Sequence, residues 1–168
     1  PATSATRASS ATRAAAGGHH HPGWASHSGT GGERVITVIY GPPGSGKTAY
    51  VNEHRKPGDV VIDLDSLCVA LGSPDTHSHP EHVKRIAGSA RASAIRKAID
   101  LGVDAWVIDT WLRTQLLRDH PGCQYLLVDP GQAVTLQRAR RDGRPDESID
   151  AIHRWYLNPP TPPRAAIE

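Results

Sequence analysis

The sequence predicts an α/β fold, a three-layer α/β/α sandwich around a mainly parallel sheet. Short runs of β-branched residues alternate with segments of helical periodicity, and nearly all Val, Ile and Leu lie between residues 35 and 157. Strands that alternate with helices favour parallel pairing through right-handed crossovers. With 168 residues, the chain has room for one such domain.

Strands are predicted from short aliphatic runs, and helices from periodicity and stop signals. The first run, residues 35–40, is β-branched and leads directly into Gly-rich sequence, as expected of a buried parallel strand. The longest helical pattern ends at Gly102, and an earlier helix is stopped by Pro57 and Gly58. The expected strands cover residues 35–40, 60–62, 105–108 and 125–128, and the expected helices cover 47–54, 83–101, 134–141 and 147–157.

Composition divides the chain into three regions. Residues 1–32 consist mainly of Ala, Ser, Thr, Gly, Arg and His, which predicts a disordered basic tail. The lack of acidic residues in this segment also fits an organellar transit peptide, and its run of three histidines could bind a metal. Residues 33–158 form the predicted folded domain. Residues 159–168 contain four prolines and predict an extended tail.

Residues 41–48 read Gly-Pro-Pro-Gly-Ser-Gly-Lys-Thr and match the phosphate-binding pattern G-x-x-x-x-G-K-[ST]. The glycines let backbone N–H groups point at phosphates, Lys47 supplies charge to the β and γ oxygens, and Thr48 offers a hydroxyl to Mg²⁺. A chance Gly-Pro turn is the alternative, but the motif follows a strand and opens a helix, as ATP binding requires. The predicted nucleotide-binding residues are Gly41, Pro42, Pro43, Gly44, Ser45, Gly46, Lys47, Thr48 and Ala49.

Two carboxylates follow the second strand, at the sheet edge where α/β proteins bind ligands. Alternation along an extended chain would place Asp63 and Asp65 on one side of the backbone. Asp65 is the candidate general base, and Asp63 is a candidate ligand of both substrate and Mg²⁺. The alternative is that these residues cap a helix that contains residues 67–71.

Four arginines cluster late in the chain, on a short helix and a Gly-containing loop. Such a cluster is typical of a lid that closes over a triphosphate and neutralises the migrating phosphoryl group. A solvated basic face is the alternative. Because no Glu follows Asp109-Thr110 at the end of the third strand, a hydrolytic motor is disfavoured relative to a kinase. The cluster is Arg138, Arg140, Arg141 and Arg144, of which Arg138, Arg141 and Arg144 are the candidate catalytic residues.

Residues 35–158 resemble the phage-type polynucleotide 5′-hydroxyl kinase domain and its zeta-toxin-like relatives. The shared features are the phosphate-binding loop, Asp65 at the place of the general base, Asp109-Thr110 after the third strand, and a final helix with the pair Trp155-Tyr156. The resemblance implies an ATP- and Mg²⁺-dependent kinase that phosphorylates the 5′-hydroxyl of a polynucleotide. It also implies that Asp109 organises the acceptor side.

One position departs from this family, which carries an Arg three residues after the base, where it contacts the substrate phosphate. Cys68 stands there instead. Arg85, Arg91 and His79 are candidates to replace that Arg, and Arg85 is the predicted substrate-binding residue. We interpret His77 and His79 mainly as part of a flexible loop.

The net charge and the composition exclude few functional classes. The net charge of +2 is too small to require a polyanionic partner, and the two cysteines form no C-x-x-C pair. We expect a bacterial or phage-infected cytoplasm and no membrane span. Three alternatives stay open: a nucleotide-binding ATPase module that serves a nucleic-acid enzyme, a kinase for a nucleotide or small metabolite, and DNA binding by the basic residues Lys84, Arg85, Arg91, Arg96 and Lys97.

Overall fold

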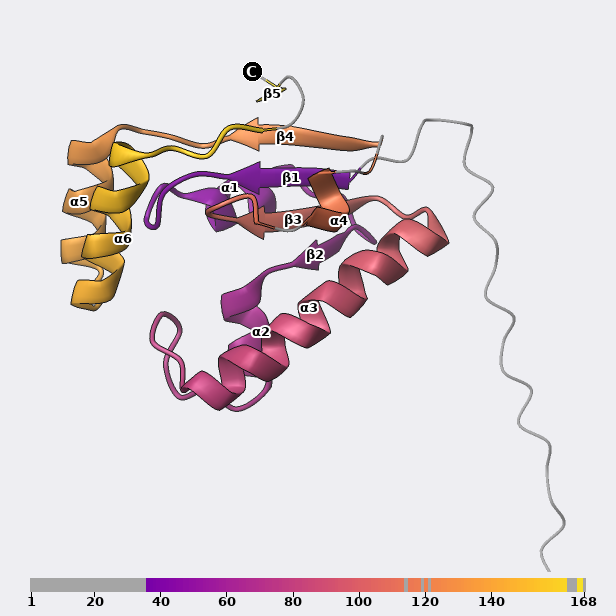
Figure 1. Cartoon of the computed structure of the whole chain (residues 1–168), viewed down its shortest axis with the longest axis horizontal. Coiled ribbons are helices and arrows are strands. Elements are labelled where there is room, and N and C mark those ends of the chain that lie inside the picture. The colour runs from indigo at the N-terminus through magenta and orange to yellow at the C-terminus, as the bar shows by residue number, and fades with distance from the viewer. Residues whose placement is uncertain (1–35, 114, 119, 121, 163–165, 168) are drawn as a thin grey trace, which may run out of the picture. The chain divides into compact units, whose positions relative to one another are not determined.

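The computed structural model describes residues 36–113, 115–118, 120, 122–162 and 166–167. The predicted tail at residues 1–32 lies outside the described residues, as does part of the C-terminal tail. Figure 1 shows a sheet with helices on both sides of it, which confirms the predicted α/β fold. Within the described residues, no helix has the length and apolar character needed to span a bilayer.

The sheet has five strands in the order β2-β3-β1-β4-β5, and each neighbouring pair is parallel. All four predicted strands are confirmed, although β4 begins two residues before the predicted run. The last strand was not predicted, because two residues in a Pro-rich tail carry no strand signal of their own. The bounds are β1 Ile36–Tyr40, β2 Val60–Ile62, β3 Ala105–Asp109, β4 Cys123–Leu127 and β5 Ala166–Ile167.

Alternation along β1 divides the core between the two faces of the sheet. Val38 and Tyr40 pack with Ile95 of helix α3 (Glu81–Leu101), whereas Ile39 packs with Val51 of helix α1 (Lys47–His54). Burying such aliphatic side chains contributes about 1.5–3 kcal/mol each. A sheet between helices on opposite faces is the three-layer arrangement that the sequence predicts.

The chain turns into a helix directly after β2, where the sequence favoured an extended segment. Helix α2 (Leu64–Ala70) begins three residues before residues 67–71, where the capping alternative placed a helix. Asp63 is its N-cap: Oδ2 of Asp63 accepts hydrogen bonds from the backbone N (3.3 Å) and Oγ (2.7 Å) of Ser66. Asp65 lies in the first turn. The predicted alternation of the two carboxylates was therefore wrong, and the capping alternative is confirmed for Asp63, whose side chain favours the cap over extension here.

Helices α5 (Gln132–Arg141) and α6 (Asp146–Leu157) pack together at the end of the sheet toward which β1 and β4 point (Figure 1). Trp155 anchors α6, because its Nε1 donates to the Thr110 carbonyl oxygen at 3.1 Å. Tyr156 donates a hydrogen bond to Asp129 beyond β4. The aromatic pair therefore ties α6 to the ends of two strands. A further short helix, α4 (Gln115–Arg118), was not predicted.

Gly41 lies in a tightly packed part of the loop after β1. Its φ is 152°, and a Cβ at this position would lie 2.1 Å from the Val128 carbonyl oxygen. We expect Gly41→Ala to lower the free energy of unfolding by about 3 kcal/mol or more, through backbone strain and steric overlap. Gly58→Ala is the matched control, because φ is 97° there and a Cβ would meet nothing within 4 Å. Urea unfolding should show a loss of only about 1–2 kcal/mol for the control, and equal losses would contradict the packing argument.

Candidate functional site

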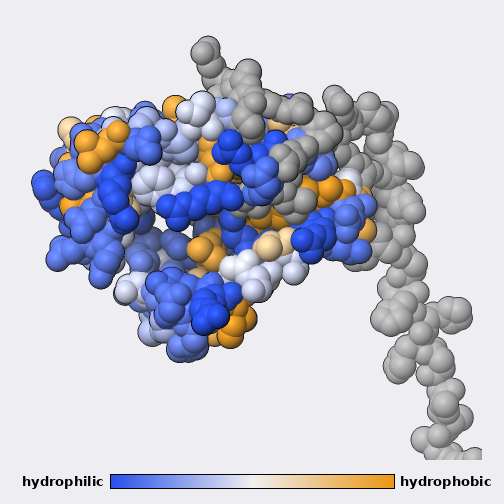
Figure 2. Space-filling model, in the orientation of Figure 1, coloured by the Kyte–Doolittle hydropathy of each residue, from blue (hydrophilic) through white to orange (hydrophobic). Residues whose placement is uncertain are grey.

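A cleft of about 1100 Å³ opens at the carboxyl ends of the parallel strands. Figure 2 shows a hollow on this face of the molecule, bordered mainly by hydrophilic residues. The loop before α1, helix α2, the end of β3 and the α5–α6 pair all contribute to its walls. The predicted site residues that line it are Pro43, Gly44, Gly46, Lys47, Thr48, Ala49, Asp63, Asp65, Asp109, Arg138, Arg141 and Arg144.

The structure does not bring Arg85 into this cleft. Arg85 lies on the exposed face of α3, where it borders a separate shallow hollow with His82, Ile86 and Ser89. Helical periodicity explains the difference, because α3 turns Arg91 toward the cleft and Arg85 away from it. Gly41, Pro42 and Ser45 belong to the phosphate-binding loop but do not line the cleft.

The phosphate-binding loop has the backbone conformation that its glycines permit. Gly44 and Gly46 have φ values of 78° and 102°, which residues with a Cβ rarely adopt. Gly46 is the N-cap of α1 and makes no side-chain cap, so the first N–H groups of the helix are left for a ligand. The loop thus presents a helix N-terminus to the cleft, an arrangement suited to binding an anion.

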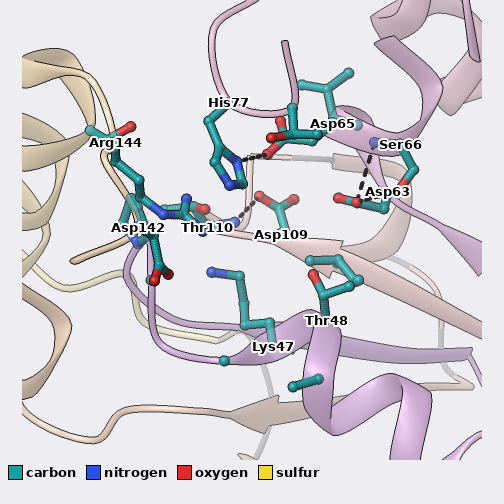
Figure 3. Close-up of a pocket in the computed structure, with 18 of the residues that line it drawn as sticks. Lys47, Thr48, Asp63, Asp65, Ser66, His77, Asp109, Thr110, Asp142 and Arg144 are labelled. Carbon is teal, nitrogen blue, oxygen red and sulfur yellow. Dashed lines mark hydrogen bonds and ion pairs between the residues drawn. The ribbon is translucent and has the colours of Figure 1, made fainter. Parts of the chain in front are cut away.

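Lys47 points into the cleft from the first turn of α1 (Figure 3). Its Nζ donates hydrogen bonds to the carbonyl oxygens of Gly41 and Pro42, both at 2.9 Å, and the residue is 8% exposed. Burial, and next the charge of Arg144, lower the pKa of Lys47 to about 8; Asp109 is the first of the carboxylates that oppose the shift. An ammonium group held out of water is a strong local charge for phosphate oxygens.

The lowered pKa of Lys47 predicts a pH-dependent affinity for nucleotide. Above pH 8 the free protein increasingly loses this charge, whereas bound phosphates favour the protonated form, so binding must take up a proton. We expect the Kd for ATP to increase as the pH rises from 8 to 9.5, by at most about tenfold per pH unit. Calorimetric titrations across this range measure the slope.

Lys47→Arg is the control for this pH dependence, since a guanidinium stays charged throughout the range. Its affinity for ATP can differ from that of the wild type, but the slope above pH 8 should disappear. The same slope in both proteins would show that another group titrates.

Asp109 is fixed from two directions. Its Oδ1 accepts hydrogen bonds from the backbone N atoms of Thr110 (2.7 Å) and Trp111 (3.0 Å). Its Oδ2 is 3.2 Å from Nη2 of Arg91, which also donates to the Ile108 carbonyl oxygen at 3.0 Å. Both side chains of the ion pair are largely buried. Asp109 is thus a rigid negative group in the cleft wall. Its partner, Arg91, was one of the candidates that the sequence offered for contact with the substrate phosphate.

Asp65 lies across the cleft from Lys47 and is half-exposed (Figure 3). Nδ1 of His77 is 3.7 Å from its Oδ2, and Nε2 of His79 is 3.4 Å from its Oδ1. Both histidines lie in the loop between α2 and α3, as predicted, but the side chain of His79 is only 5% exposed. Local sequence could not show this, because the contact depends on how residues 71–80 fold back over α2.

The arginines of the predicted lid differ in their surroundings. Arg138 lies against the phosphate-binding loop, where its Nη1 donates to the Ser45 carbonyl oxygen at 2.9 Å. Nε of Arg144 is buried and has no hydrogen-bond partner among the described residues. Arg141 is mostly exposed and pairs with Asp142 at 3.0 Å. Arg138 and Arg144 are therefore the arginines best placed to meet a bound triphosphate, and closure of a lid remains a prediction.

The residues present fit a magnesium ion that is bound together with a nucleotide. Thr48 follows Lys47 in the first turn of α1, and its side chain and that of Asp63 both border the cleft (Figure 3). Mg²⁺ usually takes few protein ligands and completes its shell with phosphates and water. Among the described residues, no group of three or more His, Cys, Asp or Glu side chains is arranged to hold a metal ion.

No family model and no curated protein sequence matches this chain. Solved structures do match it. A chain in the structure of the Pnkp1/Rnl/Hen1 RNA repair complex aligns with a TM-score of 0.59 and 12% identity, over 84% of this chain and 51% of that one. A sugar kinase from Janibacter sp. HTCC2649 aligns with a TM-score of 0.52 and 18% identity, over 80% and 83% of the two chains. The fold is that of P-loop kinases.

A second structure of the Pnkp1/Rnl/Hen1 complex aligns less fully, with a TM-score of 0.50 and 14% identity over 66% of this chain and 40% of that one. In the first alignment, this chain spans only about half the length of the matching chain. At such low identities the likeness shows a shared fold alone. The predicted roles of individual residues are supported only by the geometry of the cleft.

Proposed function

We propose that this P-loop kinase domain transfers the γ-phosphate of ATP to a hydroxyl group, and that the hydroxyl is the 5′-OH of a polynucleotide. One observation carries the proposal: a single cleft holds the phosphate-binding loop with Lys47 on one side and the half-exposed carboxylate of Asp65 on the other. Phosphoryl transfer needs positioning and charge stabilisation more than covalent participation by the protein. The cleft supplies both.

Each charged group has a task in the transfer step. Lys47 would leave the carbonyl oxygens of Gly41 and Pro42 and bind phosphate oxygens, for which its charge is the better match. Asp65 would accept the proton of the acceptor hydroxyl as the new bond from oxygen to the γ-phosphorus forms. The bond to the β,γ-bridging oxygen breaks, and ADP leaves with that electron pair.

Two arginines would stabilise the charge that develops on the transferred group. Arg138 already contacts the phosphate-binding loop, and the charge of Arg144 acts on Lys47, since it contributes to the lowered pKa of that side chain. Fixed positive groups aimed at developing charge are among the largest contributors to catalysis. A Mg²⁺ ion held at Thr48 and Asp63 would neutralise part of the triphosphate charge.

Trp111 favours an acceptor that carries a nucleobase. It follows Asp109-Thr110 at the end of β3 and borders the cleft. The Arg113 guanidinium lies 5.4 Å from the centre of its ring, so this aromatic side chain of the cleft has a positive charge beside it. Aromatic and guanidinium groups together are typical of sites for single-stranded nucleic acid. The RNA repair complex among the structural matches supports the same class of acceptor.

An acceptor screen with ATP labelled at the γ-phosphate tests this function. The acceptors are DNA and RNA oligonucleotides with a 5′-hydroxyl, free nucleotides and a panel of sugars, and Lys47→Ala is the negative control. We expect label on the oligonucleotide 5′ end with the wild-type protein and none with Lys47→Ala.

The other outcomes of the screen are equally informative. Label on a nucleotide or sugar alone would support a kinase but overturn the polynucleotide acceptor. Release of inorganic phosphate without any labelled acceptor would overturn the transferase and leave an ATPase module.

A further inference from the structure

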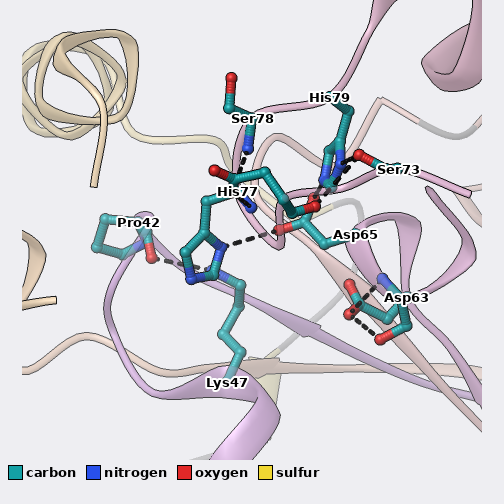
Figure 4. Close-up of polar contacts among 10 residues, drawn as sticks. Pro42, Lys47, Asp63, Asp65, Ser73, His77, Ser78 and His79 are labelled. Carbon is teal, nitrogen blue, oxygen red and sulfur yellow. Dashed lines mark hydrogen bonds and ion pairs between the residues drawn. The ribbon is translucent and has the colours of Figure 1, made fainter. Parts of the chain in front are cut away.

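Two histidines of the loop before α3 converge on the candidate base. Figure 4 shows His77 and His79 on different sides of the Asp65 carboxylate. Nδ1 of His77 and Nε2 of His79 are both buried, and neither has a hydrogen-bond partner among the described residues. The nearest acid to each is Asp65, at 3.7 and 3.4 Å. Leaving a buried donor unpaired costs about 1–3 kcal/mol, so this arrangement requires an explanation.

His79 is anchored on the side away from Asp65. Its Nδ1 is 2.7 Å from Oγ of Ser73, and both side chains are almost fully buried. The Ser73 hydroxyl also lies 3.2 Å from the Asp75 carbonyl oxygen, a longer and weaker contact. When the hydroxyl donates to Nδ1, the neutral imidazole carries its proton on Nε2, which faces Asp65.

The other assignment of protons is less favourable at Asp65. If the Ser73 hydroxyl donates to Asp75 instead, Nδ1 of His79 must carry a proton. A lone pair on Nε2 would then face a carboxylate oxygen at 3.4 Å, which is repulsive, so the contact with Asp65 favours the first assignment. The Nε2 side of the ring therefore faces Oδ1 of Asp65 at 3.4 Å, as a close polar contact without the alignment of a hydrogen bond.

The loop is closed so that His77 reaches the cleft side of the same carboxylate. Oδ1 of Asp75 accepts hydrogen bonds from the backbone N atoms of His77 (2.7 Å) and Ser78 (3.1 Å). His77 borders the cleft and its side chain is 31% exposed, in contrast to the enclosed His79. The deeper ring is therefore suited to hold the carboxylate, and the outer ring leaves room for an acceptor.

We propose that His79, anchored by Ser73, is a positioning residue that holds Oδ1 of Asp65 and turns the carboxylate toward the acceptor hydroxyl. The inference rests on the proposed function, since it assigns a task in the transfer step. A carboxylate has about four lone-pair sites, so the contact with His79 leaves others free to take the proton. Without His79, the half-exposed Asp65 side chain would sample several rotamers, and fewer of them would be productive.

A double-mutant cycle between His79 and Asp65 tests this role. The readouts are kcat and KM for ATP and for the best acceptor of the screen. We expect His79→Leu to lower kcat by about 10- to 100-fold with little change in KM for ATP, because the attacking geometry is lost and the nucleotide site is not. His79→Gln retains an N–H donor at a similar reach and should recover part of the rate.

The decisive comparison uses Asp65→Asn as the background. A residue that acts through the carboxylate should have no further effect once the carboxylate is gone, so His79→Leu should lower the residual rate by less than about twofold there. Full additivity, or an equal loss in His79→Gln and His79→Leu, would overturn the proposal. Thermal unfolding of each variant separates loss of fold from loss of positioning.

His82→Leu is the matched control. His82 is an exposed residue of α3, three positions from His79 and outside the cleft, so its replacement should leave kcat unchanged. The outcomes also separate this inference from the proposed function. A wild-type protein that labels no acceptor overturns both. A wild-type protein that labels an acceptor, together with a His79→Leu variant of equal kcat, overturns the positioning role alone.

Discussion

Asp65→Asn is expected to lower kcat for phosphoryl transfer by about 10²- to 10⁴-fold, the usual range for loss of a general base. Asn has nearly the same shape but cannot accept a proton from the acceptor hydroxyl. Asp65 lies in the first turn of α2, where Asp63 supplies the cap, so the replacement should leave the helix intact. The Kd for ATP should stay within a few-fold of the wild-type value.

Asp100→Asn is the control for this experiment, because Asp100 is an exposed carboxylate at the far end of α3, outside the cleft. Its kcat should equal that of the wild type. Initial rates with saturating ATP and varied acceptor measure both proteins, and calorimetry measures the affinity for ATP. If Asp65→Asn keeps the full rate, another group removes the proton and the His79 inference loses its basis.

The sheet and the phosphate-binding loop could be predicted from the sequence because both depend on signals that are local. The β-branched run at residues 36–40 favours a strand that is buried between two layers of helices. Gly46 adopts a φ of 102°, which permits the sharp turn into α1. The end of α3 is also a local signal, because Gly102 adopts the αL conformation and ends the helix where the sequence pattern predicts. Such signals need no knowledge of the rest of the chain.

The parts that the sequence did not predict depend on distant contacts or on competition between two local preferences. Asp63 could extend β2 or cap α2, and the hydrogen bonds to Ser66 favour the cap. The pairing of Arg91 with Asp109 joins residues that lie 18 positions apart. The contact of His79 with Asp65 requires the loop fold set by Asp75. The two tertiary contacts have no periodicity or motif from which they could be read, and for Asp63 the sequence offered extension and capping without deciding between them.

Lys47→Met is expected to lower kcat/KM for transfer by about 10²-fold at the least, the usual cost of removing one group that stabilises developing charge. Met has a similar length and no charge, so the two carbonyl oxygens lose a donor but the core does not change. Folding penalises the charged form of Lys47, as its pKa of about 8 shows, so loss of the charge offsets the lost hydrogen bonds. The variant should therefore unfold at nearly the wild-type urea midpoint while it fails in transfer.

Lys97→Met is the matched control, because Lys97 is exposed on α3 and borders neither the cleft nor the phosphate-binding loop. It should keep both the rate and the stability of the wild type. A Lys47→Met protein that is folded but inactive would show that the ammonium group serves a ligand and not the structure. A variant that retains transfer would instead mean that the triphosphate lies elsewhere, which contradicts the site as a whole. The unfolding midpoint of Lys47→Met is thus as informative as its activity. If the main role of Lys47 were to stabilise the fold, its replacement would lower the free energy of unfolding substantially.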